Sequence, residues 1–121
     1  EQIVSAIRRG GASAMADCAL GADGRRAREA GADALATTLC GYTPNTRGAE
    51  LPALRLVREL ATFGACTICE GGIADPQSGR AALAAGADAI VVGTAITSGL
   101  QSATAEATVA ERTRAFVAAL T

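Results

Sequence analysis

The stretch AGADALA at residues 30–36 decides the fold, because it returns almost unchanged as AGADAIV at residues 85–91. Each copy follows an Ala- and Arg-rich stretch and opens an apolar run of strand length. Upstream of each of these stretches lies another short apolar run that ends in an acid, at 13–17 and at 67–70. The order strand, helix, Gly-Ala-Asp turn and strand therefore occurs twice, and this repetition predicts βα units.

The residues that flank the repeats are typical of helix ends. Gly31 and Gly86 come just past two expected helices, where glycine adopts the left-handed C-cap conformation at little steric cost. Asp75 is placed to cap a helix whose first turn holds Pro76. The expected helices are 25–30, 52–62, 77–85 and 105–120, residues 1–10 are the tail of a preceding helix, and the strands are roughly 12–17, 33–39, 65–70 and 88–93. Such short βαβ units predict a parallel sheet with right-handed crossovers.

The predicted fold class is α/β, with four parallel strands alternating with helices in a single domain over residues 1–121. A small doubly wound sheet and part of a (β/α)8 TIM barrel both fit this element order. No GxGxxG follows the first strand, so the dinucleotide-binding fingerprint is missing. Glycine-bearing ends on two consecutive strands favour the barrel, which often binds phosphate after its last strands.

Composition restricts the chemistry and the partners. The 121 residues carry a net charge of −1 and no run of the roughly 18 apolar residues that a membrane span needs. The charge argues against nucleic acid and membrane partners, and residues 1–4 resemble no leader, so a cytoplasmic protein is expected. The chain contains neither His nor Lys, and it therefore lacks the common near-neutral base and the Schiff-base amine.

The four cysteines include a CxxC pair, Cys66 and Cys69, inside an apolar run that is expected to be a strand. Residues three apart on a strand point to opposite faces, so the two sulfurs diverge. No second CxxC and no His complete a metal site. Buried free thiols are expected, with no metal and no cofactor.

Acids end two of the expected strands, and in parallel α/β folds the active site lies at these carboxyl ends. Strand alternation places Glu70 on the same face as Ile68, at the inner rim of a barrel mouth, and Asp17 ends an earlier strand in the same way. Two carboxylates at one mouth can orient a polyol or act as acid and base. In the alternative interpretation, each acid caps the following helix or pairs with an arginine.

Glycines follow two consecutive strands, as Gly71-Gly72 and as Gly93-Thr94. Glycine lets the backbone approach an oxyanion closely, and a helix N-terminus directs N–H groups toward it. The pair of strand ends therefore predicts a phosphate site, although ordinary tight turns also use such glycines.

Four motifs carry a resemblance to N-acetylmannosamine-6-phosphate 2-epimerases. ATTLCGYTP at 36–44 is similar to that family's GTTLSGYTP, and MAD at 15–17 is similar to its MAD strand end. ICEGGI at 68–73 resembles IAEGRI, and VVGTAIT at 91–97 resembles VVGSAIT. The motifs keep their order and spacing over nearly the whole chain. The resemblance implies a (β/α)8 barrel of which this chain is the C-terminal half, the N-terminal half with the family's catalytic lysine being absent.

The resemblance also implies a function and a set of roles. The family interconverts N-acetylmannosamine 6-phosphate and N-acetylglucosamine 6-phosphate in sialic acid catabolism, by removing and returning the proton at C2, without a cofactor. The implied partners are a small-molecule sugar phosphate and, for the full-length protein, a second copy in a homodimer. By this resemblance Glu70 is catalytic, Asp17, Thr38 and Tyr42 bind the substrate, and Gly71, Gly72, Gly93 and Thr94 bind its phosphate.

Three positions depart from the family pattern. Where the family has an Arg after Glu-Gly, this chain has Gly72. Where the family has an Arg after the AIT segment, it has Ser98, and in place of the Ser of SGYTP it has Cys40. Backbone N–H groups would then replace a bidentate cation at the phosphate. Two other functions fit these residues: a non-catalytic sugar-phosphate-binding half-barrel, and another phosphate-binding barrel enzyme such as a thiazole synthase or phosphosugar aldolase relative. Four strands alone expose two sheet edges and an apolar face, which predicts aggregation, pairing or a longer polypeptide.

Overall fold

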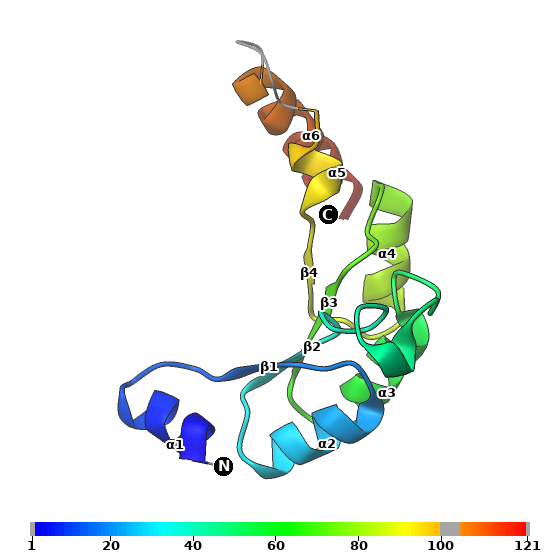
Figure 1. The fold of residues 1–121 in the computed structure, drawn as a ribbon. Helices are drawn as coiled ribbons and strands as arrows, with labels where there is room; N and C mark the ends of the chain where they lie inside the picture. The colour runs from blue at the N-terminus through cyan, green and yellow to red at the C-terminus, as the bar shows by residue number, and fades with distance from the viewer. Residues whose placement is uncertain (1, 100–104, 121) are drawn as a thin grey trace.

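The computed structural model describes residues 2–99 and 105–120 and contains a parallel four-stranded sheet with helices packed beside it (Figure 1). The strands lie in the order β1-β2-β3-β4, which is also their order in the sequence. Their bounds are β1 Met15–Asp17, β2 Ala34–Ala36, β3 Cys66–Glu70 and β4 Ala89–Val91. The helices are α1 Gln2–Arg9, α2 Gly21–Glu29, the 3-10 helix η1 Pro44–Thr46, α3 Leu54–Ala61, α4 Pro76–Ala84, α5 Thr94–Thr97 and α6 Ala105–Leu120. The predicted α/β class, with four parallel strands alternating with helices, is confirmed.

Several element ends differ from the expected ones. β2 stops at Ala36 because the chain then turns, with the Cys40 N–H donating to the Thr37 carbonyl oxygen at 3.0 Å. Helix α2 begins well before the expected Arg25, since the Asp23 carboxylate accepts the N–H of Leu20 and supports the first turn. The helix expected over 1–10 corresponds to α1, with residue 1 outside the described part, and the short α5 was not predicted.

The repeated Gly-Ala-Asp turns make the same pair of hydrogen bonds twice. Before β2, the Asp33 carboxylate accepts the N–H of Ala14 at 2.8 Å, and the Asp33 N–H donates to the Ala14 carbonyl at 2.8 Å. Before β4, Asp88 bonds the N–H and the carbonyl of Thr67 in the same way, again at 2.8 Å for each bond. Each aspartate therefore joins its own strand to the preceding strand, which fixes the register of both pairs.

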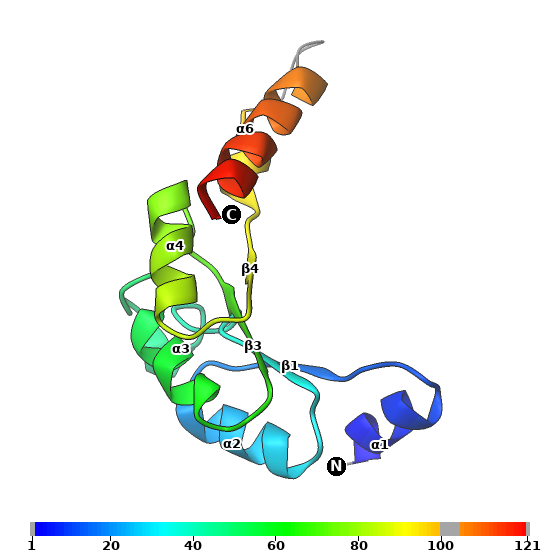
Figure 2. The ribbon, with the colours of Figure 1, turned by 180° about the vertical axis from the view of Figure 1, so that it is seen from behind.

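Helices α2, α3 and α4 cover one face of the sheet, as both views show (Figure 2). Leu35, Thr67 and Cys69 point to this covered face and are buried almost completely, against Val57 and Leu60 of α3 and their neighbours. Burial of each large aliphatic side chain contributes about 1.5–3 kcal/mol. The core therefore lies between the sheet and these helices. No described helix is both long enough and apolar enough to cross a membrane.

The opposite face of the sheet, here called the inner face, carries the residues that alternate with the core. In register across the strands, it consists of Met15, Asp17, Ala34, Ala36, Cys66, Ile68, Glu70, Ala89 and Val91. Met15 is 53% exposed and Val91 is 43% exposed, so part of this apolar surface is open. The inner face is the one that the sequence assigned to a barrel interior.

The expectation of buried thiols is wrong for Cys66. Its side chain lies on the inner face and is exposed, whereas Cys18, Cys40 and Cys69 are buried. Burial, with a smaller contribution from the nearby Asp23, raises the pKa of Cys18 to about 11. Burial also raises the pKa of Cys40 and of Cys69. These three thiols stay protonated at neutral pH.

Candidate functional site

A hollow of about 530 Å³, here called the strand-end hollow, lies where the loops after β2, β3 and β4 meet. Its lining combines one carboxylate with several glycines and hydroxyl groups. The lining residues are Thr38, Tyr42, Glu70, Gly71, Gly72, Ile73, Ala74, Val91, Gly93, Thr94, Ala95 and Ser98. Of the eight residues that the sequence proposed for the site, all except Asp17 line this hollow.

Asp17 lies apart from the strand-end hollow. Its strand β1 is separated from β3 by β2. Asp17 therefore lies two strand spacings, together roughly 10 Å, from the strand that ends at Glu70. Asp17 lines a different hollow, of about 400 Å³, and its carboxylate makes no hydrogen bond or ion pair to another described residue. The alternative role of helix cap belongs instead to Asp23, which accepts the N–H groups of Ala19 and Leu20.

Glu70 is held by two neighbouring threonines at the end of β2. The Thr38 hydroxyl donates to Glu70 Oε2 at 3.0 Å, and the Thr37 hydroxyl accepts the Glu70 N–H at 3.0 Å. The Thr37 hydroxyl also donates to the Glu70 carbonyl oxygen at 2.9 Å. Thr37 was not among the predicted site residues. The signal that could have found it is a hydroxyl residue at the end of an apolar strand, in the motif at 36–44. Glu70 is half-buried, and Oε1 makes no hydrogen bond to another described residue.

The glycine loops supply backbone donors to the same hollow. Gly71 and Gly72 follow Glu70 with φ values of +96° and +73°, a left-handed backbone that glycine adopts readily. The N–H groups of Gly71, Gly72, Gly93 and Thr94 make no hydrogen bond to another described residue. Successive free N–H groups can bind an oxyanion. None of the described residues that line the hollow is an arginine, so the lining itself offers an anion backbone N–H groups and hydroxyl groups.

The missing side chain at position 72 is explained by the segment before α3. A Cβ on Gly72 would overlap the Leu51 side chain and would lie 3.1 Å from the Leu51 carbonyl carbon and 3.1 Å from the Pro52 nitrogen. The space that an arginine would need at this position is therefore filled by residues 51 and 52. Tyr42 lies close by, with its ring 3.8 Å from a Cβ built on Gly71 and its side chain largely exposed.

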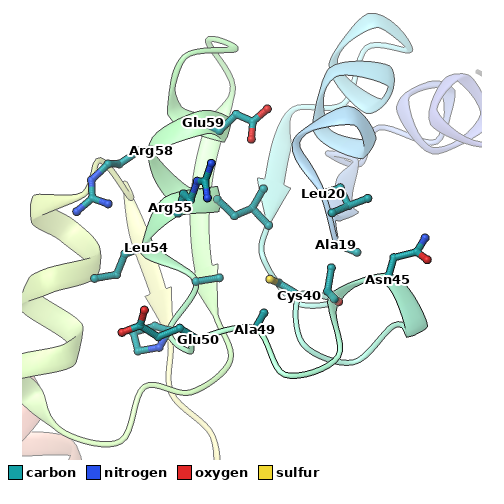
Figure 3. A pocket seen from close by; sticks show the side chains of 14 residues that line it. Ala19, Leu20, Cys40, Asn45, Ala49, Glu50, Leu54, Arg55, Arg58 and Glu59 are labelled. Atoms are coloured by element: carbon teal, nitrogen blue, oxygen red, sulfur yellow. The ribbon is translucent and has the colours of Figure 1, made fainter.

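A second hollow, of about 640 Å³, lies on the helix side of the sheet (Figure 3). Ala19, Leu20, Cys40 and Asn45 form one side of it, and Arg55, Arg58 and Glu59 of α3 form the other. It contains none of the predicted site residues and no glycine loop at a strand end. The strand-end hollow is therefore the better candidate for chemistry. Among the described residues, no three acidic or cysteine side chains are grouped so that they could hold a metal ion.

Comparison with known proteins adds to this geometry. The family described as "Putative N-acetylmannosamine-6-phosphate epimerase" matches residues 1–109. The "Bifunctional enzyme NanE/NanK" of Brucella melitensis is 43% identical over 96 residues, which cover 79% of this chain and 18% of that protein. A protein of Vibrio vulnificus that carries the name of the 2-epimerase is 41% identical over 97 residues, covering 80% of this chain and 43% of its own length.

A solved structure gives the same match. The N-acetylmannosamine-6-phosphate 2-epimerase of Clostridium perfringens superposes with a TM-score of 0.74 and 38% identity, over 78% of this chain and 42% of that one. The chain thus spans less than half the length of the relatives to which it is similar.

Proposed function

The chain belongs to the N-acetylmannosamine-6-phosphate epimerase family, and we propose that it forms the C-terminal half of a (β/α)8 barrel with that activity. The barrel would interconvert N-acetylmannosamine 6-phosphate and N-acetylglucosamine 6-phosphate in amino-sugar catabolism. The observation that carries the proposal is the strand-end hollow, in which one fixed carboxylate lies beside two glycine loops whose N–H groups are bonded by no described residue.

Epimerisation requires that the proton at C2 leaves one face of the sugar and returns to the other. The proton becomes acidic when the sugar is open, because the carbanion is delocalised into the neighbouring aldehyde. Glu70 is the group that takes or returns this proton, since its carboxylate is held at Oε2 and the residue lines the hollow. A second acid or base must serve the opposite face. The resemblance to the epimerase family assigns this group to a lysine in the other half of the barrel, and this chain contains no Lys.

The remaining residues bind the substrate in this proposal. Gly71, Gly72, Gly93 and Thr94 donate backbone N–H groups to the phosphate, without the bidentate arginine that would strengthen the interaction. Tyr42 and Thr38 contact the sugar, and the Thr38 oxygen can accept a bond from a sugar hydroxyl while it donates to Glu70. Asp17 binds a more distant hydroxyl across the mouth. The proposal includes a cytoplasmic location and a homodimer of the complete barrel.

The test uses a complete barrel, built by joining this chain to the part of the Clostridium perfringens epimerase that it does not match. We expect this barrel to interconvert the two 6-phosphates and the Glu70→Gln variant to lose about 10²–10⁴-fold in kcat, the usual contribution of one general acid or base. Glu111→Gln, on the exposed side of α6, is the matched control. Wild-type turnover in Glu70→Gln contradicts the role of Glu70. Binding of the sugar phosphates without any turnover favours the non-catalytic half-barrel instead.

A further inference from the structure

We propose that Thr37 and Thr38 are positioning residues for Glu70, the first fixing its backbone and the second fixing its carboxylate. The inference deepens the proposed function and rests on it, because it gives Glu70 the role of moving a proton. It also changes the role of Thr38, from a group that mainly binds sugar to a group that mainly orients the acid.

Thr37 bonds both the N–H and the carbonyl oxygen of Glu70 through its hydroxyl. Its hydroxyl accepts the Glu70 N–H at 3.0 Å and donates its proton to the Glu70 carbonyl oxygen at 2.9 Å. Its own N–H donates to the carbonyl oxygen of Ile68 at 3.1 Å. β2 ends at Ala36, so one side chain replaces the backbone partners that a longer strand would have offered to the last residue of β3.

The burial of Thr37 makes this contact specific. The side chain has no exposed surface, and its hydroxyl makes two short bonds to the Glu70 peptide groups beside a longer contact of 3.9 Å to the Cys69 sulfur. A buried hydroxyl needs such partners, and the Glu70 peptide groups in turn lose theirs if the hydroxyl is removed. Backbone position at Glu70 therefore depends on this residue of the neighbouring strand end.

Thr38 controls the other end of the glutamate. Its hydroxyl proton is committed to Glu70 Oε2 at 3.0 Å, so the hydroxyl can accept a bond from a substrate but has no proton left to donate. Without this bond, the long glutamate side chain is free to change rotamer in an open hollow. Misplacing a reacting group by about 1 Å can cost about 10²-fold in rate.

The two roles of Thr38 predict different kinetics in the complete barrel defined above. If Thr38 positions Glu70, Thr38→Val lowers kcat by about 10–100-fold and leaves KM within about twofold. Thr38→Ser keeps the hydroxyl and restores kcat to within about threefold. A rise in KM with unchanged kcat in Thr38→Val is the signature of substrate binding and overturns the inference.

A measurement on the complete barrel, made without substrate, decides the inference without any activity. By NMR, we expect the Glu70 side chain to hold one rotamer in the wild type and in Thr38→Ser, and to average among rotamers in Thr38→Val. We expect amide hydrogen exchange at Glu70 to rise at least about tenfold in Thr37→Val, and to keep its wild-type rate in Thr37→Ser and in Thr38→Val. If Thr37→Val does not fold, the Thr38 series still gives the answer.

These readouts separate the two proposals. An inactive complete barrel refutes the proposed function, while the NMR data do not depend on turnover. An unchanged Glu70 rotamer in Thr38→Val refutes the positioning role, whether or not the barrel turns over substrate.

Discussion

At Gly72 the backbone has a φ of +73°, and the space beside its Cα is occupied by Leu51 and Pro52. Two independent constraints therefore act on one residue: a left-handed conformation and the lack of room for a side chain. In the proposed anion site beside it, backbone groups are the donors as a direct result, because a long cation cannot be placed there while the 51–52 segment keeps its position.

Replacing Gly72 by alanine should separate these two constraints. We expect Gly72→Ala to lower the free energy of unfolding by about 2–5 kcal/mol, about 1–2 from the left-handed backbone and about 1–3 from overpacking against Leu51. The matched control is Gly64→Ala, whose φ is +68° with nothing within 4 Å of the added Cβ, and which should cost only the backbone part. Urea denaturation measures both. Equal losses in the two variants would show that Leu51 moves aside freely.

At the scale of the elements, the Gly-Ala-Asp turns hold the sheet together. Asp88→Ala removes the acceptor of the Thr67 N–H, whose residue is almost fully buried, and should lower the free energy of unfolding by about 1–3 kcal/mol. Asp88→Asn keeps an oxygen at the same position and should lose less. Chemical denaturation measures the loss in free energy of unfolding. Hydrogen exchange at the Thr67 amide shows whether the lost hydrogen bond is the one at this residue. The assignment fails if Thr67 exchanges at the wild-type rate in Asp88→Ala.

The strands and their carboxyl-end residues could be predicted because the signals are local. The Gly-Ala-Asp repeat specifies helix end, turn and strand start within seven residues, and parallel strands bring their ends to one edge. The turn after Ala36 was harder to predict, because an apolar run does not reveal where its backbone leaves the sheet. The bonds from Thr37 to Glu70 and the packing of Leu51 on Gly72 connect residues far apart in sequence, and no local pattern encodes them.

At the scale of the whole molecule, the inner face decides how the chain behaves alone. Cys66 lies on this face and is exposed, whereas the other three cysteines are buried under the helices or loops. An exposed thiol reacts through its thiolate, and burial raises the pKa of Cys18 to about 11 and also raises that of Cys69, which keeps both protonated.

The rate at which Cys66 is alkylated therefore shows whether the inner face is exposed or covered. In the 121-residue chain at pH 8, we expect iodoacetamide to modify Cys66 at least about tenfold faster than Cys18, Cys40 or Cys69, as read by peptide mass spectrometry. In the complete barrel, Cys66 should become protected, because the added strands close over the inner face. Labelling of all four thiols in denaturant is the control. Equal labelling of Cys66 and Cys69 in the native chain, or an equally reactive Cys66 in both proteins, contradicts the prediction.

The strand order of the sheet is the order in which a ribosome makes the strands. Each strand pairs with the one made just before it, and the aspartates reach back only 19 residues, from Asp33 to Ala14, and 21 residues, from Asp88 to Thr67. A nascent chain can thus join each strand to its neighbour as soon as the next turn has emerged, without waiting for a distant partner. Sheet growth in this chain is compatible with vectorial, co-translational folding from the first strand to the last.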